Sequence, residues 1–264
     1  MDKYKEFWEN NLVSSVLIKK RTGIDTGSKD YFDYYDTKLR GFDNWAVEND
    51  WYDLNNCYGK NILDIGCGNG WVSFRYACSG ANLVISDISE NAIKLSQKRF
   101  SGNSSVKKAK FLVCNAQDLP FSDSSFDAVT CISVLHNVPN YKKAIAEISR
   151  VVKRGGRVYL MVFHSRSFFS KIVIPVAAYL KHKTSQEVLN DYDGPGNPLT
   201  QVFSRKQFTV LLNKFNIRIS DLQLRYLPKE HFPLFRIKFL SHFQGFLEKK
   251  IGFYLYIKGE KCGC

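Results

Sequence analysis

Residues 62–71, ILDIGCGNGW, decide the fold of this chain. A short apolar run ends in a turn with glycine at positions 66, 68 and 70, and a helical pattern begins directly behind it. Glycine allows a tight turn and a close approach of the backbone to a ligand. The third glycine comes one position earlier than in the dinucleotide fingerprint, which disfavours a nicotinamide cofactor. Asp64, just ahead of the turn, suits a ligand with a positively charged amino group.

Outward from this turn, short apolar runs alternate with helical patterns along the chain. The pattern predicts strands at 60–66, 81–87, 109–115, 125–134, 155–163, 217–227 and 251–259. It predicts helices at 69–80, 88–100, 141–152 and 204–215, with Ser89 and Ser204 as N-caps. Nearly continuous apolar strands separated by helices indicate a parallel sheet covered on both faces. The fold class is therefore α/β, with an open, doubly wound sheet.

The two ends of the chain differ from this central pattern. We expect residues 1–55 to form a helical N-terminal cap and residues 56–264 to form the α/β domain, with lid insertions at about 164–203 and 228–250. The second insertion is basic and aromatic, typical either of an amphipathic lid on a membrane surface or lipophilic molecule or of a helix packed on the sheet. Tyr31, Tyr34 and Tyr35 either close over a ligand or pack the N-terminal helix.

Composition narrows the possible classes of protein. The net charge is +13, and residues 201–264 hold 12 Lys/Arg against 4 Asp/Glu. Such a surface attracts nucleic acid, anionic lipid or an acidic metabolite, or simply belongs to an enzyme of high pI. Seven scattered cysteines without metal-binding spacing predict no metal site. Their odd number and a charged N-terminus predict a cytoplasmic protein. The apolar run at 172–180 is about half of the roughly 20 residues that span a bilayer.

Polar positions follow several of the predicted strands. Asp87 ends the second strand, where a carboxylate can accept hydrogen bonds from both hydroxyls of a ribose. Asn115 and Ala116 follow the third strand and are placed to meet an adenine ring. Ligands of open α/β sheets bind beyond the carboxyl ends of the strands. We therefore expect Ile132, Ser133 and the pair at 136–137 near the reacting centre.

These motifs, in this order, resemble the class I S-adenosylmethionine-dependent methyltransferases of the small-molecule type, the type 11 and ubiquinone/menaquinone methyltransferase-like group. The resemblance rests on ILDIGCGNG, SDIS, NAQDLPF, SFDAVTCISVLHNVPN and AIAEISRVVKRGGRVYL and covers about residues 60–163. It implies a Rossmann-like seven-stranded sheet with the last strand antiparallel. It also implies S-adenosyl-L-methionine as cofactor and a site formed by Asp64, Gly66, Cys67, Gly68, Gly70, Asp87, Ile88, Asn115, Ala116, Ile132 and Ser133.

Within that resemblance, Asp64, Gly66 and Gly68 would surround the methionine part, Asp87 would hold the ribose, and Asn115 with Ala116 would hold the adenine. The chain departs from the family pattern at two places. The adenine position is often Asp and is Asn115 here. The loop that follows the fourth strand often reads Leu-Glu-His-Val in the family, whereas this chain places its histidine one position earlier, at His136.

The resemblance predicts methyl transfer to a small-molecule acceptor, such as a natural-product, quinone-like or cell-surface biosynthetic intermediate, of lipophilic or anionic character. The enzyme must align the acceptor with the activated methyl group and exclude water. A phenol or alcohol must also lose a proton, for which a histidine near neutrality is suited. His136 is the first candidate base and His164 the second, while His231 is either a lid residue or exposed.

Three other functions compete with this prediction. The charge suggests an RNA or tRNA methyltransferase, but no Asp/Asn-Pro-Pro-Tyr-like motif follows the fourth strand, and Cys131 lies within that strand, where burial is expected. We therefore expect no nucleic-acid partner and at most peripheral membrane contact. A non-catalytic S-adenosylmethionine-binding protein would share the cofactor site. A nicotinamide oxidoreductase is disfavoured by the glycine spacing.

Overall fold

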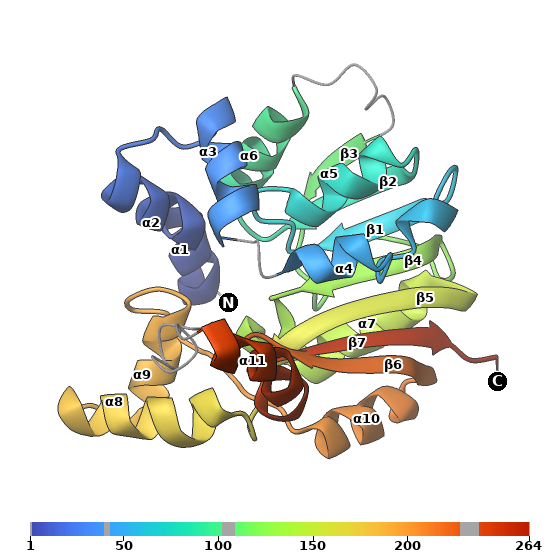
Figure 1. Ribbon diagram of the computed structural model, residues 1–264. Coiled ribbons are helices and arrows are strands. Elements are labelled where there is room, and N and C mark those ends of the chain that lie inside the picture. Colours follow the sequence, from blue (N-terminus) through green and yellow to red (C-terminus); the bar gives the residue numbers. More distant parts are fainter. Residues whose placement is uncertain (1, 40–42, 102–108, 228–237, 264) are drawn as a thin grey trace.

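The computed structural model describes residues 2–39, 43–101, 109–227 and 238–263 (Figure 1). Its centre is a seven-stranded sheet in the order β3-β2-β1-β4-β5-β7-β6. The strands are β1 (Asn61–Ile65), β2 (Asn82–Asp87), β3 (Ala109–Val113), β4 (Phe126–Ile132), β5 (Val152–Phe163), β6 (Ile217–Arg225) and β7 (Tyr254–Lys261). β7 runs antiparallel to both of its neighbours, and the pairs among β1 to β5 are parallel. The predicted Rossmann-like sheet with an antiparallel last strand is confirmed.

Four helices connect these strands at the places the sequence predicts. They are α5 (Trp71–Cys78), α6 (Glu90–Phe100), α7 (Tyr141–Val151) and α10 (Arg205–Lys214). The Ser89 hydroxyl accepts a hydrogen bond from the Ala92 N–H at 3.1 Å, and Ser204 forms a capping box with Gln207. Both predicted N-caps are confirmed. β5 begins three residues before the predicted start at 155, because Val152 already pairs with Phe126 across a register shift.

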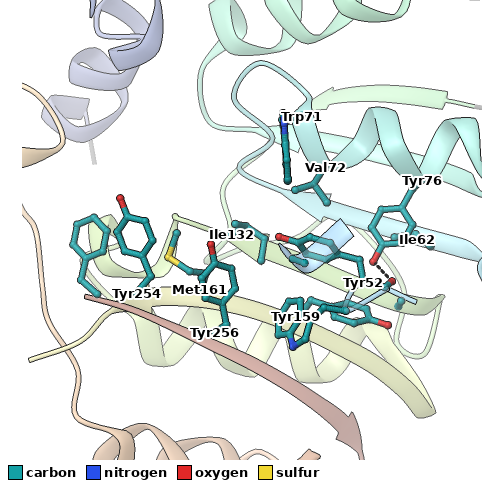
Figure 2. Close-up of a cluster of buried hydrophobic side chains, with 14 of the residues drawn as sticks. Tyr52, Ile62, Trp71, Val72, Tyr76, Ile132, Tyr159, Met161, Tyr254 and Tyr256 are labelled. Carbon is teal, nitrogen blue, oxygen red and sulfur yellow. Dashed lines mark hydrogen bonds between the residues drawn. The ribbon is translucent and has the colours of Figure 1, made fainter. Parts of the chain in front are cut away.

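The two faces of the sheet carry different cores. On one face, α7 and α10 contribute aliphatic residues such as Ile145, Ile148 and Leu212. The other face is rich in tyrosine and tryptophan, and Figure 2 shows Tyr52, Tyr76 and Tyr159 gathered there. Buried tyrosine hydroxyls need partners. The Tyr76 hydroxyl donates to the Tyr52 carbonyl at 2.7 Å, and that of Tyr159 donates to Asp53 at 2.7 Å, outside the core.

The N-terminal segment folds as helices, as expected for residues 1–55. It contains α1 (Asp2–Asn10), α2 (Val13–Thr22), α3 (Lys29–Tyr34), a π-helical turn at Tyr35–Leu39, α4 (Asn44–Glu48) and a 3-10 turn at Leu54–Asn56. The Glu9 carboxylate of α1 accepts hydrogen bonds from the N–H groups of Glu90 and Asn91, at 2.8 and 3.1 Å. These groups open α6, where helix N–H groups lack partners within the helix and favour negative charge.

A second contact holds the N-terminal segment to α6. The buried guanidinium of Arg99 donates two hydrogen bonds of 3.0 Å to the Asp36 carboxylate. Its Nε donates a third, of 2.8 Å, to the carbonyl of Asn69 in the glycine turn. A bidentate Arg–carboxylate pair fixes distance and orientation together. Asp36 and Arg99 therefore connect the N-terminal segment directly to the predicted cofactor loop.

The insertion expected at 164–203 contains a π-helical turn at Phe169–Val173, α8 (Ile174–Leu180) and α9 (Ser185–Tyr192). Figure 1 shows α1 to α3 and α8 to α9 on one side of the sheet, beyond the carboxyl ends of the parallel strands. Of the insertion expected at 228–250, residues 228–237 lie outside the described residues, and α11 (Lys238–Ile251) forms the rest. Among the described helices, none combines the length and apolar character needed to cross a membrane.

We expect Asp36→Asn to lower the free energy of unfolding by about 1–3 kcal/mol, because it leaves the buried Arg99 guanidinium without its carboxylate. Urea denaturation followed by circular dichroism measures this change. Asp33→Asn is the matched control, because Asp33 is exposed on the adjacent α3. Equal stability of the two variants would show that the Arg99 pair does not hold the N-terminal segment.

Candidate active site

A cavity of about 420 Å³ lies between the carboxyl ends of the central strands and the N-terminal helices. Every position predicted to hold the cofactor lines it except Gly70: Asp64, Gly66, Cys67, Gly68, Asp87, Ile88, Asn115, Ala116, Ile132 and Ser133. Gly70 instead shapes the turn, because it is the N-cap of α5 with φ +78° and a Cβ there would lie 2.4 Å from Ser96 Oγ.

The glycine turn has a geometry that other residues would not adopt. Gly66 has φ +70°, and a Cβ on it would lie 2.2 Å from Cγ2 of Val134. Both the backbone conformation and the close approach of the loop after β4 therefore require glycine. Gly68 has φ +55°, and a Cβ there would meet nothing within 4 Å. At Gly68 the requirement is conformational, and open space lies beside it.

Asp64 differs from the expectation that its carboxylate faces a cationic ligand. It is buried at the end of β1, opposite Thr130 of β4. Oδ1 accepts a hydrogen bond from the Thr130 hydroxyl at 2.6 Å, and Oδ2 accepts one from the Ser73 hydroxyl of α5. Each oxygen is already bonded to the protein, so the carboxylate connects two strands and a helix beneath the glycine turn. Any attraction for a bound cation adds to this connecting role.

Asp87 joins the second strand to the glycine turn. Oδ2 accepts a hydrogen bond from the Gly68 N–H at 2.9 Å, and Oδ1 accepts one from the Ser89 N–H at 3.0 Å. Burial raises the pKa of this carboxyl to about 6, and the backbone hydrogen bonds only partly offset that effect. A carboxylate oxygen has a second lone pair, so both oxygens can still accept bonds from a ligand in the cavity.

The adenine positions are also partly occupied within the protein. Oδ1 of Asn115 accepts hydrogen bonds from the backbone N–H and the side-chain amide of Gln117, at 3.0 and 3.2 Å. The side-chain amide oxygen of Gln117, Oε1, accepts from the Asn140 N–H at 3.0 Å. This small network fixes the loop after β3 against the loop after β4. The Asn115 oxygen that was expected to accept from adenine already has two donors.

Asn69 is a site residue that the sequence analysis missed. It sits inside the glycine turn, lines the cavity and is only 5% exposed. Within the described chain, neither its amide nitrogen nor its oxygen has a hydrogen-bond partner. A buried amide without partners is costly, which points to a polar ligand at this place. The position was inside the quoted motif, but its residue type alone does not signal a role.

His136 lies behind the cavity wall and does not line the cavity. It is fully buried, and its ring stacks on Phe163 with centroids 3.8 Å apart. Nε2 lies 3.0 Å from Oδ2 of Asp193, which does line the cavity. Because a carboxylate only accepts, this contact places the imidazole proton on Nε2. The expectation of direct contact with an acceptor therefore needs correction: His136 meets the cavity through Asp193.

His164 does not contact the cavity either. It is buried outside the cavity lining, and its backbone forms a bridge with Phe203. Burial lowers the pKa of its imidazole to about 4, so the ring is neutral at physiological pH. The expectation that His164 reaches the reacting centre is thus not met by its position. His231 lies outside the described residues.

Asp193 is the second site residue that the sequence analysis missed. It opens the turn-rich stretch DGPGNPLT, 57 residues beyond His136. The Asn137 amide also donates to Asp193 Oδ2, at 2.8 Å. The side-chain oxygen Oδ1 of Asn137 accepts in turn from the Asn197 amide at 3.1 Å and from the Thr200 hydroxyl at 3.2 Å. These buried contacts join the loop after β4 to the 164–203 insertion and hold the Asp193 carboxylate at the cavity.

The remaining wall of the cavity is largely aromatic. It includes residues of the N-terminal helices, of α9 and of the sheet: Tyr4, Trp8, Tyr35, Phe163, Tyr192 and Tyr254. The three N-terminal tyrosines therefore do not share one position relative to the cavity. Tyr35 lines the cavity, whereas Tyr31 is buried and its hydroxyl bonds to that of Ser15 at 3.1 Å. Tyr34 is outside the lining.

Comparison with known proteins agrees with this arrangement. Residues 63–160 match the family model of the methyltransferase domain. Over these residues the chain is similar to the class I S-adenosylmethionine-dependent methyltransferase domain. The cofactor of this domain is S-adenosyl-L-methionine. Asn69, with its unpaired buried amide, and the glycine turn beside Asp87 fit the polar and nucleoside parts of that molecule.

Two curated relatives illustrate the extent of the similarity. A demethylmenaquinone methyltransferase of Clavibacter sepedonicus is 41% identical over 105 residues, which is 40% of this chain and 42% of that protein. The ubiquinone/menaquinone biosynthesis C-methyltransferase UbiE of Zymomonas mobilis is 33% identical over 136 residues, 51% of this chain and 56% of that protein. The chain thus spans about half the length of the curated relatives it matches.

Solved structures share the fold at low identity. An S-adenosylmethionine-dependent methyltransferase of Methanosarcina mazei is 24% identical, with a TM-score of 0.57 over 77% of this chain and 93% of that one. The [4+2]-cyclase SpnF is 17% identical, with a TM-score of 0.56 over 80% of this chain and 77% of that one. Because the same fold occurs in a cyclase, the fold does not specify the reaction.

We expect the affinity for S-adenosylhomocysteine to be about tenfold weaker at pH 5 than at pH 7.5. Ribose hydroxyls donate best to an ionised carboxylate, and the free Asp87 carboxyl, with a pKa of about 6, is mostly protonated at pH 5. Bound ribose should lower that pKa, so binding strengthens as pH rises through about 6. Isothermal titration calorimetry at both pH values measures the change.

Asp87→Asn should bind more weakly and lose the pH dependence, whereas Asp123→Asn, an exposed carboxylate remote from the cavity, should keep it. In the free protein, the raised pKa of Asp87 affects folding stability in the opposite direction, so that stability falls as pH rises. Its contribution to stability is complete below the ordinary value of 3.8 and is lost as pH rises through about 6. An unchanged pH profile in Asp87→Asn would contradict the ribose assignment.

Proposed function

We propose that this chain transfers the methyl group of S-adenosylmethionine to a small-molecule acceptor bound in the same cavity. The observation that carries the proposal is the continuity of that cavity. Part of its lining holds the glycine turn, Asp87 and Asn115, and another part is aromatic with a carboxylate, Asp193, held at the cavity. A protein that only bound the cofactor would have no need for this second wall.

The cofactor half of the cavity is assigned as follows. Asp87 binds the ribose hydroxyls, while Asn115 and Ala116 border the adenine. Asn69, Gly66 and Gly68 surround the methionine part, where the unpaired Asn69 amide is available for a polar group. When bound, S-adenosylmethionine supplies a methyl carbon already activated by its sulfonium. The residues of the chain therefore have to bind, orient and exclude water.

The acceptor half suits a flat, apolar molecule. Aromatic side chains from the N-terminal segment and from α9 line the cavity, and Tyr35 and Tyr192 are examples. The curated relatives bear names of demethylmenaquinone, ubiquinone/menaquinone and O-methyltransferases. A quinol-like or phenolic acceptor, lipophilic and carrying an acidic hydroxyl or ring carbon, agrees with both observations.

Asp193 is the proposed proton acceptor. For an O–H acceptor, the oxygen lone pair forms the new bond to the methyl carbon while the carbon–sulfur pair remains on sulfur, leaving S-adenosylhomocysteine. The acceptor proton passes to the Asp193 carboxylate. His136 and Asn137 are positioning residues that donate to Oδ2 and keep the carboxylate at the cavity. The histidine thus takes part in acid–base chemistry through Asp193 rather than by contact.

The cofactor part of the proposal is tested by calorimetry with two ligands. S-adenosylhomocysteine should bind with a single saturable site, and nicotinamide adenine dinucleotide should give no heat of binding at the same concentration. Binding of the dinucleotide in preference to the homocysteine would overturn the assignment.

Transfer itself is tested with radiolabelled S-adenosylmethionine and three acceptor classes: 1,4-naphthalenediol, catechol and bulk tRNA. We expect label on a small aromatic acceptor. Transfer to tRNA alone would favour the nucleic-acid function and contradict the proposal.

With the best acceptor, Asp193→Asn should lower kcat by about 10² while the affinity for S-adenosylhomocysteine changes less than about twofold, because general-base assistance is typically of this size. Asp191→Asn is the matched control from the same segment, because that carboxylate pairs with Lys183 at 2.6 Å and is outside the cavity lining. Equal kcat in both variants would remove Asp193 from proton transfer. His136→Asn should shift the pH profile of kcat and leave cofactor affinity unchanged.

A further inference from the structure

The helical segment made of the π-helical turn Phe169–Val173 and α8 is apolar on two faces. One face is buried: Phe169, Ile174 and Ala178 are about 5% exposed or less and pack into the aromatic core. A helix at the surface of a globular protein usually has polar residues on its other face. The outward face of this segment therefore differs from the ordinary pattern.

That outward face is a stripe of large apolar side chains. Ile172, Val176, Tyr179 and Leu180 are 49%, 52%, 82% and 70% exposed. Their spacing of four, three and one residues places them along one side of the helix. Eight large hydrophobic residues are exposed in the described chain, and these four lie within nine consecutive positions. Such clustering marks an interaction surface, whereas single exposed apolar residues are ordinary.

Positive charge surrounds the stripe. Residues 165–183 contain four Lys/Arg and no Asp or Glu. Lys183 pairs with Asp191, but Lys171 and Lys181, at the two ends of the stripe, are exposed and have no ion-pair partner among the residues that the structure describes. An apolar stripe between cations is complementary to a surface that is apolar inside and anionic at its boundary.

We propose that α8 docks on an anionic lipid bilayer. Ile172, Val176, Tyr179 and Leu180 enter the boundary between headgroups and acyl chains, and Lys171 and Lys181 contact lipid phosphates. A second copy of the chain fits less well. In a two-fold contact the same surfaces meet, so the cations at both ends would face like charges. The proposal goes beyond methyl transfer and does not depend on it.

The position of the segment gives this docking a consequence for the cavity. Figure 1 shows α8 at the edge of the molecule beside α9, away from the central strands. On its inner side, the Phe169 ring contacts that of Tyr192, with centroids 5.0 Å apart, and Tyr192 lines the cavity. The docked helix would therefore form the support of the aromatic wall and bring that wall close to the bilayer.

The test is co-sedimentation of the full chain with vesicles. One preparation contains phosphatidylglycerol and phosphatidylcholine in equal parts, and the other contains phosphatidylcholine alone. We expect binding to the anionic vesicles, at least tenfold weaker binding to the neutral ones, and a decrease with added salt. Binding of equal strength to both preparations, or to neither, overturns the proposal.

Two pairs of variants locate the surface. Tyr179→Ser should lower partitioning to anionic vesicles about fivefold, because tyrosine favours the membrane interface. Tyr58→Ser should change it less than twofold, since Tyr58 is equally exposed, at 85%, but lies next to β1 at the amino end of the strands. Lys171→Glu/Lys181→Glu should lower it at least tenfold, and Lys142→Glu/Lys143→Glu on α7, with the same change in net charge, should have a much smaller effect.

The affinity for S-adenosylhomocysteine serves as the folding control, and all four variants should retain it. Equal losses within either matched pair would show that overall charge or apolar content causes binding, and this would overturn the assignment to α8. Concentration-dependent dimers that Tyr179→Ser abolishes, without vesicle binding, would show that a second copy covers the stripe. Loss of docking leaves the proposed methyl transfer untouched, and loss of cofactor binding leaves docking untouched.

Discussion

The close approach of the loop after β4 to the glycine turn is the constraint on which the site depends. Val134 lies where a side chain at position 66 would have to be, so the two loops can meet only because that residue is glycine. Their meeting brings the ends of β1, β2 and β4 to one cavity. Asp64 reinforces the arrangement from below, since its carboxylate accepts hydroxyl hydrogen bonds from both β4 and α5. Asp87 completes it by accepting from the backbone of Gly68.

The aromatic side of the cavity depends on segments added to this frame. The N-terminal segment reaches α6 through Glu9 and Asp36, which bind the start of that helix and the buried Arg99. The 164–203 insertion reaches the loop after β4 through a buried network of amides and hydroxyls, with Asn137 at its centre. Each added segment is thus held by polar groups that are satisfied only in the assembled structure. This explains how aromatic residues from the N-terminal segment and from the 164–203 insertion line the same cavity.

The electrostatics of the site follow from burial. Two carboxylates lie close to the glycine turn: Asp64 is buried, and Asp87 is partly buried. Asp64 accepts hydrogen bonds from the hydroxyls of Thr130 and Ser73, and Asp87 accepts them from the backbone N–H groups of Gly68 and Ser89. The raised pKa of Asp87 is the cost of that arrangement. On the aromatic side of the cavity, His136 and Asn137 both donate hydrogen bonds to Asp193.

The sequence by itself determined the sheet, its connecting helices, the caps at Ser89 and Ser204, and many of the residues that line the cavity, because these depend on local periodicity and on glycine conformation. Tertiary structure alone decided the partners. His136 meets Asp193 across 57 positions and Arg99 meets Asp36 across 63, and residue type does not encode such distant pairing. The same reason hid the unpaired amide of Asn69, because burial without a partner is a property of the assembled surroundings. It also hid the apolar stripe on α8, whose composition resembles that of an ordinary core helix until its outward face is known.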